Sequence, residues 1–285
     1  MPRMESPSSI NTYKLCKRKY YYSYKLNLPR KENISAVTGK IVHETLENFF
    51  SINTADLKNV DYGDFLKHKL LALFNQSWTK AMPNLSNLEN SKETIREHYE
   101  ASLFMLKNFI DDFLSALSAE INGSTVQEAF SNLRPKTEIY LRSDKYGVQG
   151  FVDAVLEIGN DIYIIDYKTS SRDDITEEYK LQLAIYALLY NEKYEQIPKK
   201  VGLHFLRHGT KKFIEVSEEL LEKAKKECEL IHINTESNTI ENYDKNPGPY
   251  CRWKTGQCSF YDICYGIKKL EDFYEKEKLV QLKDD

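Results

Sequence analysis

The sequence predicts an α/β fold in which a helical half precedes a central mixed sheet flanked by helices, and a cysteine-rich extension follows. Apolar residues recur at the helical period through the first 133 residues, and they alternate with polar residues from Thr137 onward. Between Thr137 and Ile233 the patterns run strand–strand–strand–helix–strand–strand–helix, which is typical of an α/β sheet. Cysteines then gather in the turn-rich stretch from Asn246 to Tyr265.

Helices are expected through the first half of the chain. One begins at a cap on Ser8 or Ser9 and runs through Cys16 to Tyr24, and a loop follows from Asn27 to Ser35. The next helices have apolar side chains at helical spacing and cover Thr38–Phe50, Tyr62–Lys80 and Ser91–Leu117. The last helix carries one apolar stripe, which we interpret as core: Ile95, Tyr99, Leu103, Leu106, Ile110, Phe113 and Leu117.

The second half alternates strands with helices. The expected strands are Thr137–Arg142, Gly147–Glu157, Asp161–Tyr167, Lys200–Leu206 and Lys212–Val216. The expected helices are Thr176–Tyr194 and Ser217–Ile233, and the stretch from Cys264 to Lys278 is expected to end in a helix. We expect a single domain over residues 1–285, with a mainly helical part at 1–133, a core at 134–235 and a cysteine-bearing extension at 236–285.

Composition and charge limit the class of protein. Hydrophobic residues make up 41% of the chain, and no apolar run is long enough to span a membrane. Met1 to Ile10 has no apolar signal-peptide core, so we expect an intracellular, cytoplasmic protein without a membrane contact. The net charge of −3 gives nucleic-acid binding no support by itself, because phosphate binding usually needs excess positive charge.

A local basic stretch nevertheless lies between Lys14 and Lys31. It contains no acid, and tyrosines interleave with its cations. Cations can hold phosphates while aromatic rings stack on bases, so this stretch is a candidate nucleic-acid surface. A solvated helix face with tyrosines packed inward explains the pattern equally well. The candidate contacts are Lys17, Arg18, Lys19 and Tyr20.

Two carboxylates and a lysine point to a metal site. Asp153 lies on the second strand, whereas Asp166 and Lys168 lie two residues apart on the third strand and therefore share a face. If these strands pair as a hairpin, the two acids lie side by side, where a proton or a cation must separate them. A hard divalent cation such as Mg²⁺ or Mn²⁺ suits such oxygen ligands. The alternative is an exposed ion pair at a hairpin end, although Asp166 ends a strongly apolar strand.

Further side chains could complete a phosphodiester-hydrolysing site. A divalent cation makes a bound water more acidic, and Lys168 would hold or deprotonate that water and neutralise charge on the phosphate. Gln182 and Tyr186 share a face of the following helix, where Gln182 can bond a base, a phosphate or the water, and Tyr186 a phosphate. An exposed glutamine and a core tyrosine are the alternative. His43 is a third element, although a lone helical histidine is more often structural.

Together these motifs resemble the PD-(D/E)XK nuclease superfamily, specifically its RecB-type branch. The matching segments are Gly39-Lys40-Ile41-Val42-His43, Gly150-Phe151-Val152-Asp153, Asp166-Tyr167-Lys168-Thr169 and Gln182-Leu183-Ala184-Ile185-Tyr186. The resemblance implies a restriction-endonuclease-like sheet, with His43, Asp153 and Asp166 as metal ligands. It implies Lys168 as the catalytic base or water-orienting group and, more loosely, Glu138 as an outer acid. The segment around Cys16 is similar to that of iron–sulfur members, which include nucleases of recombination and of CRISPR spacer acquisition.

The cysteines favour a metal cluster over disulfides, because their number is odd and no signal peptide precedes them. Four thiolates suit either an iron–sulfur cluster or structural zinc. The wide spacing of Cys16, Cys251, Cys258 and Cys264 favours a [4Fe–4S] cluster, because zinc sites typically use tight pairs. Six residues separate Cys251 from Cys258, where the family often has two. We interpret Cys228, in the middle of a helix, as a bystander.

The leading hypothesis is therefore a metal-dependent deoxyribonuclease that carries Mg²⁺ or Mn²⁺ and a [4Fe–4S] cluster. We expect an exonuclease on single-stranded DNA or duplex ends. One alternative is a catalytically idle DNA-binding subunit of a recombination, repair or CRISPR-adaptation complex, and another is an iron–sulfur redox protein. The intact acid–lysine set argues against both. The sequence has no helicase motif, so DNA unwinding would need a helicase partner.

Overall fold

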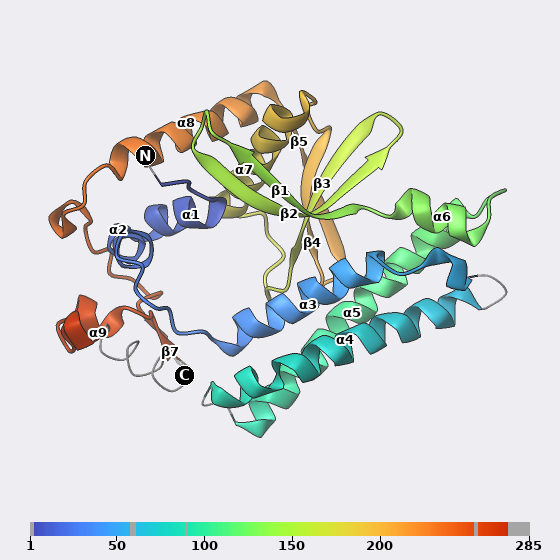
Figure 1. Cartoon of the computed structure of the whole chain (residues 1–285), viewed down its shortest axis with the longest axis horizontal. Helices are drawn as coiled ribbons and strands as arrows, with labels where there is room; N and C mark the ends of the chain where they lie inside the picture. The colour runs from blue at the N-terminus through green and yellow to red at the C-terminus, as the bar shows by residue number, and fades with distance from the viewer. Residues whose placement is uncertain (1–2, 58–60, 89–90, 254–255, 273–285) are drawn as a thin grey trace, which may run out of the picture. The chain divides into compact units, whose positions relative to one another are not determined.

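The computed structural model describes residues 3–57, 61–88, 91–253 and 256–272 (Figure 1). These residues divide into two compact units. The sheet unit contains Glu32–Ser143 and Gln149–Ala224. The terminal unit combines the described residues within Met1–Lys31, Asp144–Val148 and Lys225–Asp285. The two ends of the chain therefore belong to one unit, and the acid–lysine segments belong to the other.

A five-stranded mixed sheet forms the centre of the sheet unit. Its strands are β1 (Lys136–Ser143), β2 (Val148–Ile158), β3 (Asp161–Lys168), β4 (Lys200–Phe205) and β5 (Thr210–Glu215), in the spatial order β1-β2-β3-β4-β5. β2 and β3 are antiparallel, β3 and β4 are parallel, and β4 and β5 are antiparallel. The α/β fold with a mixed sheet is confirmed, and so is the predicted β2–β3 hairpin.

Helix α7 (Glu177–Tyr194) makes the crossover from β3 to β4. Its N-cap is Thr176, whose hydroxyl accepts a hydrogen bond from the backbone N–H of Tyr179. Parallel strands need such a crossover, and a helix usually supplies it. The helix packs against β1, β3 and β4. Its nearly continuous run of buried residues from Leu181 to Tyr190 reflects this sheet contact.

The remaining helices of the sheet unit pack together and can be followed as neighbouring ribbons in Figure 1. They are α3 (Ile34–Phe50), the 3₁₀ turn η2 (Thr54–Leu57), α4 (Tyr62–Asn87), α5 (Lys92–Glu120) and α6 (Val126–Leu133). The predicted helices exist, but α3 begins earlier because Asn33 caps it, and α4 continues past Pro83. Helix α6 was not predicted, although Thr125 and Glu128 form a capping box at its start. The apolar stripe of α5 lies in the core, as predicted.

The two faces of the hairpin have different neighbours. Ala154 and Tyr167 belong to the hydrophobic cluster formed with helices α3–α6, and Ile165 packs against it. Side chains alternate along a strand, so Asp166 and Lys168 point to the opposite face. There they contact Gln182 of α7. The acid–lysine pair is therefore held between the sheet and its crossover helix.

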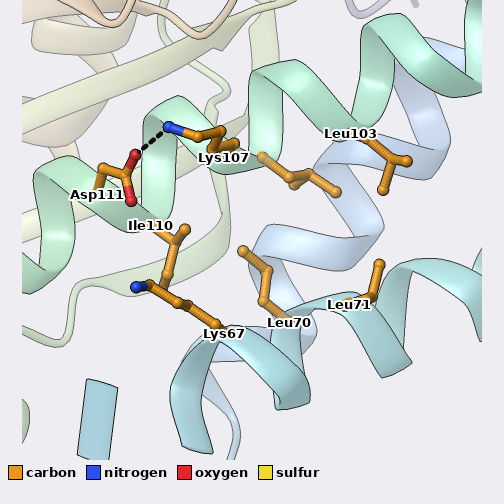
Figure 2. A pocket seen from close by; sticks show the side chains of 8 residues that line it. Lys67, Leu70, Leu71, Leu103, Lys107, Ile110 and Asp111 are labelled. Carbon is orange, nitrogen blue, oxygen red and sulfur yellow. Dashed lines mark hydrogen bonds and ion pairs between the residues drawn. The ribbon is translucent and has the colours of Figure 1, made fainter. Parts of the chain in front are cut away.

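An apolar groove of about 310 Å³ lies between α4 and α5 (Figure 2). Leu70, Leu71, Leu103 and Ile110 line it, and a Lys107–Asp111 ion pair of 2.6 Å lies at its side. The groove is where the apolar stripe of α5 reaches the surface. None of its lining residues lines the cavity around the acids.

The terminal unit contains short elements from both ends of the chain. They are α1 (Pro7–Leu15), α2 (Lys17–Tyr20), the π-helical turn η1 (Tyr21–Lys25), the C-terminal part of α8 (Glu218–Asn234), the 3₁₀ turn η3 (Ile240–Asn242), β6 (Arg252–Trp253), β7 (Gly256–Gln257) and α9 (Tyr261–Cys264). The first predicted helix was wrong in two respects. Its cap is Ser6, not Ser8 or Ser9, because Ser6 and Ser9 form a capping box around Pro7. It also breaks at Cys16, whose backbone is extended.

The stretch from Cys264 to Lys278, which was expected to end in a helix, leaves the helical conformation after Cys264 and is helical again at Glu271 and Asp272. The chain turns from Tyr265 to Ile267, and Gly266 has a positive φ of 72°, which a helix cannot contain. Residues 273–278 lie outside the described residues. Within the described ranges, no helix is both long enough and apolar enough to cross a membrane.

Candidate functional site

The two predicted acids meet at the ends of β2 and β3. The antiparallel register pairs Ala154 with Ile165, so Asp153 faces Asp166 one step further on. An Asp153 carboxylate oxygen accepts a 2.7 Å hydrogen bond from the backbone N–H of Tyr167. Asp166 is only 3% exposed, and burial raises the pKa of its carboxyl to about 6, against the opposing charge of Lys168. The expected pair of neighbouring acids is therefore present, and one of them is buried.

Lys168 and Gln182 hold the Asp166 carboxylate in a small network. The Lys168 ammonium lies 2.5 Å from Asp166 Oδ2 and donates a 2.9 Å hydrogen bond to Gln182 Oε1. The Gln182 amide donates to Asp166 Oδ1 at 2.9 Å and to the Tyr186 hydroxyl at 3.0 Å. The ring of Tyr179 lies 4.7 Å from the Lys168 ammonium. The ion pair is buried, not a surface pair at the hairpin end, and Gln182 is not a freely exposed side chain.

His43 and Glu138 approach Asp153 from other elements. His43 Nδ1 of α3 lies 3.4 Å from Asp153 Oδ1. Burial would lower the pKa of His43, but the hydrogen bond and the charge of Asp153 outweigh burial and raise this pKa. Burial and, secondarily, the Asp153 charge raise the pKa of Glu138 on β1. Ligand atoms of His43, Glu138 and Asp153 all lie within 4.8 Å of one another.

This donor set fits a divalent cation. Two carboxylates and one imidazole nitrogen are ligands that divalent cations accept, and a cation would offset the repulsion between Glu138 and Asp153, which adds to burial in raising the pKa of Glu138. The predicted ligands His43 and Asp153 are thus brought together. The carboxylate of Asp166, the third predicted ligand, faces Lys168 and Gln182 in this structure. Glu138, which the sequence indicated only loosely, has a left-handed backbone with φ of 48°, an irregularity that strand periodicity cannot reveal.

All these groups except Glu138 line one cavity of about 680 Å³. Gly39 of α3 allows the approach of the loop after β3, because a Cβ at this position would lie only 3.3 Å from the Thr169 hydroxyl. The cavity also contains residues that the sequence did not single out. They are Ser35, Thr38, His98, Ala101, Met105, Ser170, Ser171, Tyr179 and Arg207. Tyr179 could have been found, since it lies three residues before Gln182 and thus on the same helix face.

The four predicted cluster cysteines line a single pocket of the terminal unit. Cys16 enters it from the break between α1 and α2, and Cys251, Cys258 and Cys264 enter from the chain end. Their thiols are free, and the Lys245 ammonium donates a hydrogen bond to the carbonyl of Cys264. Aromatic and basic residues complete the pocket: Arg18, Lys19, Tyr22, Tyr250, Phe260, Tyr261 and Tyr265. Cys228 is fully buried in α8, and burial raises the pKa of its thiol to about 12.

The basic stretch differs from the prediction at one residue. Tyr20 has no exposed surface and its hydroxyl donates a 2.5 Å hydrogen bond to buried Glu5. It cannot stack on a base, so its prediction as a nucleic-acid contact is wrong. Arg18 donates to the Tyr243 carbonyl and Lys17 is exposed, so the basic contacts stay predictions.

Comparison with models of known protein families finds a match to a nuclease superfamily. The model of the PD-(D/E)XK nuclease superfamily matches residues 5–265. The CRISPR-associated exonuclease Cas4 of Francisella tularensis subsp. novicida is 30% identical over 125 residues, which are 44% of this chain and 59% of that protein. The DNA replication ATP-dependent helicase/nuclease DNA2 of Saccharomyces cerevisiae is 26% identical over 209 residues, which are 71% of this chain and 14% of that protein. This chain therefore spans less than two thirds of the length of either relative.

A crystal structure from Eubacterium rectale superposes with a TM-score of 0.48 at 11% identity, over 93% of this chain and 94% of the solved chain. The family match extends over nearly the whole sequence and includes both acids and the lysine. This chain belongs to the PD-(D/E)XK nuclease superfamily.

Proposed function

We propose that the chain is a deoxyribonuclease that removes nucleotides from single-stranded DNA or duplex ends with Mg²⁺ or Mn²⁺. The observation that carries this proposal is the meeting of His43 and Asp153 with the buried Asp166–Lys168 pair in one cavity. The name of the Francisella relative, an exonuclease, and that of the yeast relative, a DNA replication nuclease, support the mode and the substrate.

We assign His43, Asp153 and Asp166 as the metal ligands and Glu138 as an outer acid, supported by its position beside His43 and Asp153. A bound cation supplies Lewis acidity, which activates water and withdraws charge from the phosphate. Lys168 orients the attacking water and stabilises the negative charge that develops on the phosphate. The water oxygen bonds to phosphorus and loses a proton to solvent, while the bond from phosphorus to the leaving nucleotide oxygen breaks and that oxygen takes up a proton from solvent.

Two residues of α7 support this chemistry. Gln182 is a positioning residue, because its amide contacts both Asp166 and Lys168. Burial and the Asp166 charge raise the pKa of Tyr186, so its hydroxyl keeps its proton and can donate to a phosphate. Lys17, Arg18 and Lys19 remain proposed DNA contacts.

We further propose that Cys16, Cys251, Cys258 and Cys264 bind a [4Fe–4S] cluster. Their common pocket and free thiols support this assignment. The wide spacing of these cysteines along the sequence favours a cluster over structural zinc, whose sites typically use tight cysteine pairs.

The mode of cleavage can be tested with one set of DNA substrates. Single strands and blunt duplexes, labelled at either the 5′ or the 3′ end, are digested under single-turnover conditions. An exonuclease releases a labelled mononucleotide or short product first from one end. A ladder of internal products from a closed circular single strand would overturn the exonuclease assignment and leave the nuclease assignment in place.

Elemental analysis tests the cluster. Protein purified without oxygen should contain about four irons and equivalent labile sulfide, with broad absorbance near 400 nm. Stoichiometric zinc without iron or sulfide would replace the cluster with a structural zinc site.

We infer that the chain works with a partner that unwinds DNA or captures spacer DNA. The yeast relative is named as both a helicase and a nuclease, and the Francisella relative is named as a CRISPR-associated exonuclease. These two names support the inference. The organisation as one nuclease domain and the cytoplasmic location stay predictions.

A further inference from the structure

The active-site cavity contains an arginine that the acid–lysine chemistry does not use. Arg207 lines the cavity together with Lys168 and the two acids. It lies in the turn between β4 and β5, just beyond the β4 residue Phe205 that pairs with Lys168. The backbone N–H of Leu206 still donates to the Lys168 carbonyl at 3.0 Å. The turn that contains Arg207 is therefore hydrogen-bonded to the end of β3, the strand of Asp166 and Lys168.

Several contacts fix this turn. The Asn108 side-chain amide donates to the carbonyls of Leu206 and Arg207 at 2.9 and 3.2 Å. The His208 Nε2 lies 2.9 Å from the Ser171 carbonyl, which joins the turn to the loop after β3. Gly209 has a positive φ of 63°, a conformation that glycine adopts without strain. The backbone of Arg207 is therefore held in place before any substrate binds.

Among the residues that the structure describes, the Arg207 guanidinium has no anionic partner. Within the described part of the chain, no carboxylate forms an ion pair with Arg207, whereas Lys168 pairs with Asp166 and His43 with Asp153. The Arg207 Nε atom is buried and has no hydrogen-bond acceptor. A buried donor without an acceptor costs free energy, so such groups usually have a function. An anionic ligand in the cavity would supply an acceptor for this buried Nε donor.

The surroundings of Arg207 suit a phosphate. Ser35, Thr38, Ser170 and Ser171 line the same cavity. The Thr38 and Ser170 hydroxyls donate to backbone carbonyls, whereas those of Ser35 and Ser171 can donate to phosphate oxygens. His98 also lines it, and burial together with the Arg207 charge lowers the pKa of His98. Arginine binds phosphate through a planar fork that offers two parallel hydrogen bonds.

We propose that Arg207 binds a backbone phosphate next to the one that is hydrolysed, and so positions the DNA strand in the site; this inference rests on the proposed function. The hydrolysed phosphate needs the ligands on β2 and β3 with Lys168, whereas Arg207 lies two residues beyond the partner of Lys168. Because β4 ends at Phe205, Arg207 lies in the turn outside the set formed by the ligands and Lys168, and we assign it to a neighbouring phosphate.

The first experiment compares Arg207→Gln with wild type. A contact present in both ground state and transition state affects KM, so we expect KM to rise about ten- to hundredfold with kcat within about threefold. The slope of log affinity against log salt concentration should decrease in magnitude by about 1, the amount expected for the loss of one phosphate contact. Arg96→Gln is the matched control, because Arg96 is an exposed side chain of α5 paired with Glu93. An unchanged KM in Arg207→Gln would overturn the proposal.

The Arg207→Lys variant separates the effect of the guanidinium's two parallel donors from the effect of its positive charge. Lysine keeps the positive charge but cannot present two parallel donors, so it should recover only part of the affinity. Complete recovery would overturn the role of the buried Nε donor. Thermal melting of each variant checks that it folds.

A chemical substitution locates the phosphate. Single neutral methylphosphonate linkages are placed in turn along a single-stranded oligonucleotide. One linkage beside the cleavage position should lower the DNA affinity of wild type. The same linkage should lower the affinity of Arg207→Gln only slightly, because that variant has already lost the contact. Equal losses in both proteins at every position would contradict the assignment. If wild type does not cleave DNA, the proposed function fails, whereas the arginine contact is still measured by anisotropy of the same oligonucleotides in EDTA.

Discussion

Replacing Gln182 by alanine is expected to misplace Lys168 and to slow DNA cleavage far more than it weakens DNA binding. The Gln182 amide accepts from Lys168 at 2.9 Å and donates to Asp166 at 2.9 Å and to Tyr186 at 3.0 Å. Hydrogen bonds to charged groups contribute about 1.5–3 kcal/mol each. Because water can enter the cavity and replace part of this network, we expect the free energy of unfolding to fall by about 2–4 kcal/mol.

The catalytic effect follows from geometry. A misplacement of a catalytic group by about 1 Å can cost roughly a hundredfold in rate. Cleavage by Gln182→Ala should therefore be about a hundredfold slower under single-turnover conditions, with DNA affinity within about threefold of wild type. Urea unfolding in EDTA, single-turnover cleavage and fluorescence anisotropy measure the three quantities.

Gln196→Ala is the matched control, since Gln196 is exposed and donates one 3.2 Å hydrogen bond to the Asn160 carbonyl. It should change stability by less than about 0.5 kcal/mol and leave cleavage unchanged. If Gln182→Ala cleaves within threefold of wild type, Lys168 does not depend on Gln182 and the positioning role is refuted.

Two further predictions concern stability. His204 is 2% exposed, and burial lowers its pKa from 6.5 to about 4. The unfolded chain therefore binds the proton more tightly, and the free energy of unfolding should fall by about 3 kcal/mol as the pH drops from about 6.5 to 4. His204→Gln should remove this part of the pH dependence in urea titrations, and an unchanged profile would contradict the assignment. Cys16→Ala should lower the melting temperature and iron content of anaerobic protein, whereas Cys228→Ala should retain the iron; equal iron loss in both variants would exclude a specific role for Cys16.

Periodicity and turn chemistry predicted most of the sheet unit. The hairpin turn and alternating residues located β2 and β3 and thus placed Asp153 opposite Asp166. The i, i+4 spacing put Gln182 and Tyr186 on one face, and they contact each other through the side-chain amide. These features depend on local patterns, which a single sequence contains.

Other parts of the site depend on contacts between distant segments. Glu138 approaches Asp153 through an irregular backbone on β1, and Arg207 enters the cavity from a turn that Asn108 of α5 holds. Tyr20 lies in a basic stretch, but its hydroxyl contact with Glu5 keeps it buried. Neither periodicity nor charge count contains this information, because tertiary contacts decide it.

The helix break at Cys16 also depends on tertiary contacts between distant segments. The sequence around it favours continuous helix, but Cys16 is buried in the pocket with the three C-terminal cysteines, and its backbone is extended. Residues from the far end of the chain stabilise the break. The side-chain amide of Asn246, for example, donates a hydrogen bond to the Leu15 carbonyl. A local pattern could identify the cysteine as a candidate ligand but not the backbone that presents it.

Cleavage of end-labelled DNA by wild type and Asp153→Asn, with and without Mg²⁺ or Mn²⁺, tests the central claim most directly. Asparagine keeps an oxygen that can accept the 2.7 Å hydrogen bond from the Tyr167 N–H, so the variant should fold while losing the ligand charge. We predict cleavage by wild type that requires the cation and stops in EDTA, and a loss of at least about a thousandfold in Asp153→Asn. Cleavage by wild type in EDTA, or by Asp153→Asn within tenfold of wild type, would contradict a metal-dependent nuclease site at Asp153.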